Sequence, residues 1–278
     1  MNHFEDQLVS KLKNGDQESF TLLFELYGKK IYNLAFKMCG NKEDSEDIVQ
    51  KTFIQAVLNI NNFKEESSVY TWLYTIAKNL CLRLLEKRKK SSFSALDSLI
   101  HSVQSKEGLD NFKVIEKQHY ISQVKEGCLL GLLRCLSFYQ RIAFILSVLL
   151  EVKVKDTAII INKSESAVRI LIHRAKQNLK AFLCKNCSLY DVNNPCQCEN
   201  LINFSIKQNW VRKITGERFM PKSNNDVDAI ENEIDSLKKI TRLYNSLEDD
   251  EPSLNILNLI QKEINDKSYK IFSDKKVK

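Results

Sequence analysis

The chain has 278 residues, and only 7 of them are glycine and 3 are proline. A fold that needs many tight turns is therefore disfavoured, and a helical fold is favoured. The formal net charge of +7 suggests an anionic partner. No segment approaches the roughly 18 to 20 consecutive apolar residues of a membrane span. The first residues also lack the apolar core of a signal peptide, so we expect a cytoplasmic protein without a membrane span.

Residues 1–90 predict a first helical domain. From Phe20 to Met38, apolar side chains recur at steps of three and four, which is the pattern of a helix with one buried face. Gly40 and Asn41 end this helix. A second helix opens near Asp44 with acidic residues in its first turn, where they suit the helix dipole.

The stretch 62–90 combines a polar loop, a helix with Trp72 and Tyr74, and a run of positive charge. Exposed aromatic side chains can stack on unpaired bases, an asparagine can read a base edge, and lysine and arginine can follow phosphates. The same pattern also fits two aromatic residues of a helix core followed by a solvated helix end. The residues alone leave both interpretations open.

Residues 91–117 have little periodicity, which predicts a linker with a transient helix around 96–103. The second helical domain, 118–183, contains a helix-turn-helix pattern: a short helix around 158–161, a turn at Asn162 and Lys163, and a longer helix capped by Ser164. The outward face of the longer helix is polar and basic, with Ser166, Arg169, His173, Lys176 and Lys180. Such a helix can enter a DNA major groove, but basic amphipathic helices without DNA partners are also common.

Residues 184–278 predict a helical extension that opens with a cysteine cluster. The four thiols that a closed tetrahedral zinc site requires lie close together, at Cys184, Cys187, Cys196 and Cys198. Free or redox-active thiols are the alternative. The other four cysteines stand singly within helical patterns and are predicted to be small buried hydrophobic residues: Cys39, Cys81, Cys128 and Cys135. Two more helices are predicted, near 226–247 and 253–266.

Motifs of catalysis are absent from the sequence. It has no glycine-rich phosphate loop, HExxH motif or GxSxG motif, and its histidines are isolated. We therefore expect no enzymatic activity and no required cofactor. A structural zinc ion in the cysteine cluster is the metal that the sequence suggests.

Three segments of the first domain, "DQESFTLLFELYGKKIYNLAF", "DSEDIVQKTFIQAV" and "NFKEESSVYTWLYTIAKNL", resemble region 2 of bacterial RNA polymerase sigma factors of the extracytoplasmic-function (ECF) type. In the second domain, "LSFYQRIAFILSVL" and "NKSESAVRILIHRAKQNL" resemble region 4. The resemblance implies an all-α protein: a region 2-like bundle and a region 4-like helix-turn-helix joined by a linker, plus the helical extension. It also implies a dissociable polymerase subunit that recognises promoter DNA and opens its strands without nucleotide hydrolysis.

The resemblance assigns roles by position. The helix near residue 44 would bind the clamp helices of the β′ subunit of core polymerase through Asp44, Glu46, Asp47, Gln50 and Phe53. The second domain would bind the β flap. The minus-ten element and the melting strand would be held by Asn62, Lys64, Trp72, Tyr74, Lys78, Asn79, Arg83, Lys87, Arg88, Lys89 and Lys90. The minus-thirty-five element would be read by Ser164, Glu165, Ser166 and Arg169, with His173, Arg174 and Lys176 near phosphates.

The chain departs from the family pattern at three points. Arg83 stands where the family usually has aspartate, Leu171 stands where arginine is common, and a Glu-Ile-Ala triplet is replaced by Asp156-Thr157-Ala158. The extension is similar to one found in a subset of these sigma factors, which implies an accessory, regulatory module. A separate anti-sigma factor stays open as a partner.

Two other functions stay open. One is a helix-turn-helix regulator that binds duplex DNA without polymerase, and the other is a zinc or thiol sensor. The first domain distinguishes the regulator, because a plain regulator needs neither a polymerase-binding helix nor an aromatic helix that holds one strand.

Overall fold

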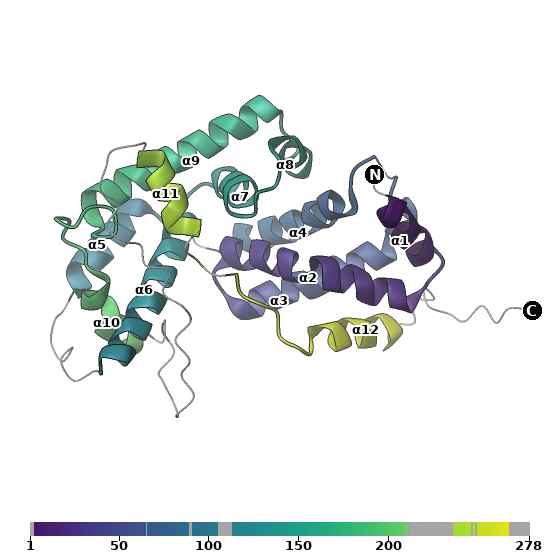
Figure 1. Ribbon diagram of the computed structural model, residues 1–278, viewed down its shortest axis with the longest axis horizontal. Coiled ribbons are helices and arrows are strands. Elements are labelled where there is room, and N and C mark those ends of the chain that lie inside the picture. Colours follow the sequence, from purple (N-terminus) through teal and green to yellow (C-terminus); the bar gives the residue numbers. More distant parts are fainter. Residues whose placement is uncertain are drawn as a thin grey trace, which may run out of the picture. The chain divides into compact units, whose positions relative to one another are not determined.

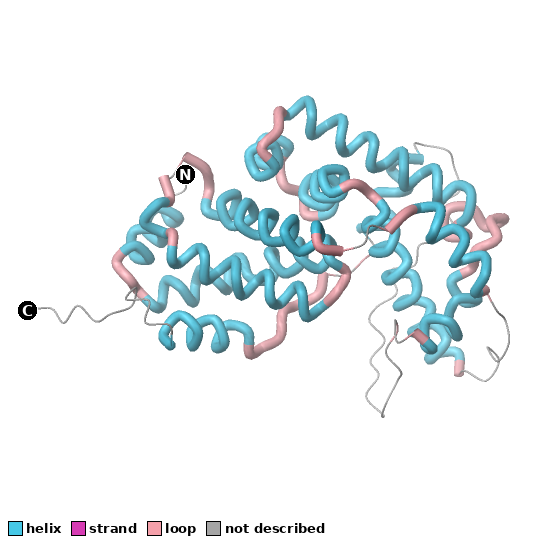
Figure 2. The backbone as a smooth tube through the Cα atoms, turned by 180° about the vertical axis from the view of Figure 1, so that it is seen from behind, coloured by secondary structure: helices cyan, strands magenta, loops and turns pink. Residues whose placement is uncertain are grey.

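The computed structural model describes residues 3–64, 66–88, 91–104, 113–208, 211, 236–245, 247 and 249–266. The regular structure in these ranges is helical, which confirms the predicted all-α class (Figures 1 and 2). One isolated β-bridge joins Cys187 to Cys196. Among the helices of the described ranges, none is both long and apolar enough to cross a membrane.

Contacts divide the chain into two compact units. Unit 1 comprises residues 1–89, 145–169 and 249–278, and unit 2 comprises residues 90–144 and 170–248. These units differ from the domains that the sequence motifs indicate. Part of the helix-turn-helix segment and the last part of the extension pack with the N-terminal block.

Three long helices form the centre of unit 1 and pack against one another: α2 (Gln17–Cys39), α3 (Lys42–Leu58) and α4 (Val69–Glu86). Helix α1 (His3–Lys13) packs on α2, and the short 3-10 helix η1 (Ile60–Asn62) packs beside α1 and α3. Fully buried side chains from all three long helices, such as Phe20, Phe53 and Leu73, fill the centre. This three-helix core positions the faces of α3 and α4.

Local capping explains where the long helices begin and end. Asp16 accepts a hydrogen bond from the Ser19 N–H (2.9 Å) at the start of α2. Gly40 ends α2 with a φ of 68°, a left-handed conformation that glycine adopts without a steric penalty. Asn41 then caps α3 by accepting from the Asp44 N–H (2.9 Å). The predicted boundary at Gly40 and Asn41 is confirmed.

Two later parts of the chain complete unit 1. The π-helix η3 (Ile145–Leu149) packs on α2, and α8 (Val154–Ile161) packs on α4. Helix α12 (Ile256–Asp266) packs on α3, and Figure 1 shows it in yellow alongside the central helices. The helices predicted around 158–161 and 253–266 are confirmed.

Unit 2 is built around α6 (Val114–Cys135), which packs against α5 (Phe93–Val103), η4 (Cys198–Leu201) and α10 (Ile202–Lys207). It also contains α7 (Phe138–Phe144), α11 (Ser236–Asn245) and most of α9 (Glu165–Asn186). The buried Tyr244 donates to the Leu129 carbonyl (3.1 Å), and its ring packs edge-on against Phe144. The predicted linker therefore contributes a packed helix, α5, to this unit.

Candidate functional site

Helix α3 presents an acidic face that contains most of the residues predicted to bind polymerase. Asp47 is half exposed, and its carboxylate pairs with Lys51 one turn further along (2.5 Å). Asp44 accepts a hydrogen bond from the guanidinium of Arg88 (2.7 Å). That ion pair joins the acidic face of α3 to the basic end of α4.

Two further residues of this face already have partners within unit 1. Glu46 accepts a hydrogen bond from the backbone N–H of Ser253 (3.1 Å). The Gln50 amide donates to the Glu263 carboxylate (2.7 Å). Both partners belong to the last described segment of the chain, which the sequence did not connect with α3.

Two predicted site residues lie in the core instead of on a face. Phe53 is fully buried, and its ring packs against Phe24 and Phe20 with centroid distances of 5.0 and 6.4 Å. Tyr74 is 3% exposed, and burial raises the pKa of its hydroxyl well above the usual value. Both predictions are corrected, because a buried ring cannot contact polymerase or stack on a base without leaving the core.

The outer side of α4 aligns an aromatic ring, an amide and a cation. Trp72 is half-buried and packs against Phe63, with ring centroids 4.9 Å apart. The exposed Asn79 and Arg83 follow Trp72 by seven and eleven residues, which is about two and three helical turns, so the three share one side. Lys78 lies elsewhere around the helix, where burial lowers the pKa of its ammonium group.

Exposed polar residues continue this surface beyond both ends of α4. Asn62 and Lys64 are exposed in the segment before the helix. Lys87 and Arg88 are exposed where it ends. The predictions for Lys89 and Lys90 fall outside the described residues.

Tyr70, in the first turn of α4, makes a contact with α8 that the sequence analysis did not predict. Its hydroxyl donates to the carboxylate of Asp156 on α8. Burial and this hydrogen bond raise the pKa of Tyr70. The sequence marked Asp156 as a departure from the family pattern, but it did not indicate Tyr70 as its partner.

The helix-turn-helix has the predicted local geometry. Asn162 takes the left-handed conformation (φ 53°, ψ 57°) between α8 and α9, and Ser164 accepts from the Ala167 N–H (3.2 Å) as the cap of α9. An exposed ion pair joins Glu165 to Arg169 (3.7 Å). The predicted DNA-reading residues are exposed at Ser164, Glu165, Ser166, Arg169, His173 and Arg174, and partly exposed at Lys176.

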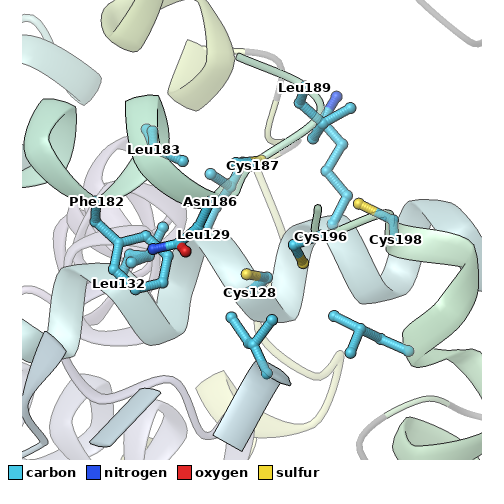
Figure 3. Close-up of a pocket in the computed structure, with 13 residues that line it drawn as sticks. Cys128, Leu129, Leu132, Phe182, Leu183, Asn186, Cys187, Leu189, Cys196 and Cys198 are labelled. Carbon is cyan, nitrogen blue, oxygen red and sulfur yellow. The ribbon is translucent and has the colours of Figure 1, made fainter. Parts of the chain in front are cut away.

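Four cysteines of unit 2 line one pocket, but they are not the four that were predicted. Cys128 on α6 joins Cys187, Cys196 and Cys198, whereas Cys184 is not part of the lining (Figure 3). Backbone hydrogen bonds from Ser188 to Cys196 and from Cys196 to Asn186, both 3.0 Å, hold the two sides of the loop together. A distance along the sequence of about sixty residues hid Cys128 from the pattern search.

The pocket keeps these thiols protonated. Burial raises the pKa of Cys196 to about 11 and that of Cys198 to about 12, and it raises those of Cys128 and Cys187 as well. In the part of the chain that the structure describes, no three cysteine, histidine or acidic side chains converge on a point where they could hold one metal ion.

Two family models match the chain in the order in which the motifs occur. Sigma-70 region 2 matches residues 23–91, and Sigma-70 region 4 matches residues 126–179. The chain belongs to the ECF sigma factors. Neither model extends past residue 179. The segment 187–198, which we call the cysteine loop, and α12 of this sigma factor therefore lie outside both models.

Two named relatives are themselves sigma factors. The ECF RNA polymerase sigma factor SigW of Bacillus subtilis is 29% identical over 178 residues, which cover 62% of this chain and 92% of SigW. RNA polymerase sigma factor YlaC of Bacillus subtilis is 28% identical over 171 residues, covering 61% of this chain and 95% of YlaC. Among solved structures, CnrH in complex with the cytosolic domain of CnrY is 20% identical, covering 65% of this chain and 97% of that chain with a TM-score of 0.48.

Proposed function

We propose that this sigma factor binds core polymerase through the acidic face of α3 and promoter DNA through α4 and α9. The observation that carries the proposal is the alignment of Trp72, Asn79 and Arg83 on the outer side of α4. An aromatic ring, an amide and a cation in one line suit an unpaired base, its edge and its phosphate. A regulator that only binds duplex DNA has no use for such a line.

Strand opening follows from binding alone. A base that unstacks thermally is trapped when it stacks on Trp72, and Asn79 can hydrogen-bond its exposed edge. The cations Arg83, Lys87 and Arg88 then hold the phosphates of the same strand. The proposal includes no catalytic step and no nucleotide hydrolysis, and it places the protein in the cytoplasm with the polymerase.

Helix α9 supplies recognition of the duplex element. The cap residue Ser164 and the first-turn residues Glu165 and Ser166 are exposed, so they can contact base edges when this end of the helix enters a major groove. The exposed His173 and Arg174 lie two turns further along, where phosphates are the nearer partners. The second domain would also meet the β flap, and an anti-sigma factor remains a partner of the proposal.

The polymerase contact is tested by reversing one charge. Asp47 is exposed and pairs with a neighbour on its own helix, so we expect Asp47→Lys to leave the helical signal in circular dichroism unchanged. Because an acidic patch steers and orients a charged partner, we expect about three- to tenfold weaker binding to purified core polymerase. Unchanged core affinity in a titration would remove α3 from the proposal.

We also propose a structural zinc ion, with Cys128 in place of Cys184 among its four predicted ligands. The support is the gathering of Cys128, Cys187, Cys196 and Cys198 around one pocket. Zinc would bind them as thiolates and so reverse the effect of burial on their pKa values. The side chains would have to turn towards a common centre, because they do not converge as they stand. A thiol sensor without metal is the alternative use of the same pocket.

A further inference from the structure

Residues 249–266, which we call the C-terminal cap, lie along α2 and α3 within unit 1. The first part of the cap is acidic and follows a polar stripe of α2. Lys37 pairs with Asp249 (2.7 Å), and Lys29 pairs with Glu251 (2.8 Å). Between these pairs lies Asn33, described next. Lys37, Asn33 and Lys29 stand one turn apart on α2 and contact Asp249, Asp250 and Glu251 in that order, so the cap runs antiparallel to α2 here.

Asn33 makes the most specific of these contacts. Its side-chain amide donates to the Asp250 carbonyl (3.0 Å), and its side-chain oxygen accepts from the Asp250 N–H (3.1 Å). This reciprocal pair satisfies both backbone groups of one cap residue. The neighbouring Lys37 side chain is only 5% exposed, so its ammonium group depends on Asp249 and Asn33 for hydrogen-bond acceptors.

The second part of the cap, residues 253–266, contains α12 and adds an apolar stripe and three polar contacts. Ile256, Ile260 and Ile264 recur every four residues and are buried. Ser253 and Glu263 bond to Glu46 and Gln50 on α3, as described above. The Gln261 amide donates to the Thr21 hydroxyl of α2 (3.3 Å). The cap therefore contacts both helices at once.

The three-helix core is complete without the cap. The region 2 model ends at residue 91, and relatives match this chain over 92 to 95% of their own length while covering only about three fifths of it. The fully buried Phe20, Phe53 and Leu73 pack within α2, α3 and α4. Beneath the cap, the residues that bond to it are polar: Thr21, Lys29, Asn33, Lys37, Glu46 and Gln50. Water or another partner can replace the hydrogen bonds that these polar groups make to the cap, whereas the buried isoleucines of α12 lose their apolar contact when the cap opens.

We propose that the C-terminal cap occupies the polymerase-binding surface in the free protein, so that core polymerase must displace it. The proposal rests on the function proposed above. Glu46 and Gln50 are bonded to Ser253 and Glu263 of the cap, so a polymerase subunit that docks on these two side chains competes with the cap for them. The apparent core affinity is then the intrinsic affinity reduced by the fraction of molecules with the cap open.

One position on the cap and its neighbour give a matched pair of variants. Ile260 is 0% exposed, whereas the adjacent Leu259 is 52% exposed on the same helix. Ile260→Asp places a charge in the apolar contact and opens the cap, so we expect about tenfold or more tighter binding to core polymerase. Leu259→Asp adds the same charge on the outer side and leaves core affinity unchanged. The measurement is a titration of labelled core with each full-length protein.

A reversible lock tests the same proposal in the opposite direction. The side chains of Thr21 and Gln261 meet, with 3.3 Å between the Thr21 hydroxyl oxygen and the Gln261 amide nitrogen. A disulfide between Thr21→Cys and Gln261→Cys would join the cap to α2 on oxidation, provided that the backbones bring the two Cβ atoms to within about 4 Å. We expect the oxidised double variant to lose core binding and to regain it on reduction, while the wild type treated in the same way does not change. An oxidised variant, with the cross-link verified by mass spectrometry, that binds core as well as the reduced one would overturn the proposal.

The outcomes separate this proposal from the function on which it rests. If wild type, Ile260→Asp and a chain shortened after residue 248 all bind core equally, the cap proposal fails and the sigma function stands. If none of them binds core, the sigma function fails and the cap proposal fails with it. If the shortened chain and Ile260→Asp both bind core polymerase more tightly than wild type and Leu259→Asp does not, the cap proposal is supported.

Discussion

At the scale of single residues, two aromatic side chains two positions apart on α4 differ in how deeply they are buried. From the sequence alone, Trp72 and Tyr74 are interpreted alike, as two base-stacking rings or as two core residues. Two positions on a helix are about 200° apart, so the two rings point to different sides, and the sequence could not show which side meets α2 and α3. The structure puts Tyr74 at 3% exposure and leaves Trp72 half-buried against Phe63. Burial therefore depended on neighbours that lie far away in the sequence, and only the fold could supply it.

This difference gives a pair of expected outcomes. Tyr74→Ala removes a buried ring and should lower the free energy of unfolding by about 3–5 kcal/mol. Trp72→Ala should lower it by clearly less, but should weaken strand opening by the loss of about 1–3 kcal/mol of base stacking. Urea unfolding and the fluorescence of 2-aminopurine in a promoter duplex measure the two effects. A Trp72→Ala variant that opens promoters as well as wild type would contradict its role.

At the scale of elements, the cysteine loop and α6 come together in a way that spacing along the chain did not reveal. The sequence indicated four thiols between 184 and 198, and three of these line the pocket. Cys184 lies on α9 outside the lining, and Cys128 from α6 takes a place in it. The pattern could predict the loop thiols because they are neighbours in sequence. It could not predict Cys128, whose approach depends on how α6 packs on η4.

The zinc proposal is tested by replacing Cys128 and Cys184 with serine, one at a time. In protein purified under reducing conditions, we expect Cys128→Ser to lower the zinc content and Cys184→Ser to leave it at the wild-type level. Each variant replaces one thiol by a hydroxyl in unit 2, so each is a control for the other. Zinc measured by inductively coupled plasma mass spectrometry decides between them. Wild-type protein that contains no zinc would contradict the zinc proposal, and the pocket would then hold only protonated thiols.

At the scale of the whole molecule, the order of motifs was readable from the sequence and the grouping of segments was not. Helix boundaries at Gly40, Asn162 and Ser164 followed from capping and turn chemistry, and they are confirmed. The motifs also suggested four consecutive parts divided at 90, 117 and 183. Contacts instead place 145–169 and the described residues 249–266 with the N-terminal block. Residues such as Asn33 and Lys37 showed no functional signal, because their partners in the cap lie more than two hundred positions later.

The central claim is that this chain directs core polymerase to promoters. The most direct measurement is in vitro transcription of a genomic fragment library by purified core polymerase, alone, with the wild-type chain and with Ile260→Asp. We expect new start sites with the wild type and more transcripts from the same sites with Ile260→Asp, whose polymerase-binding surface is uncovered. No new start site with either protein, while both still retain duplex fragments, would contradict the claim and leave a helix-turn-helix regulator that acts without polymerase.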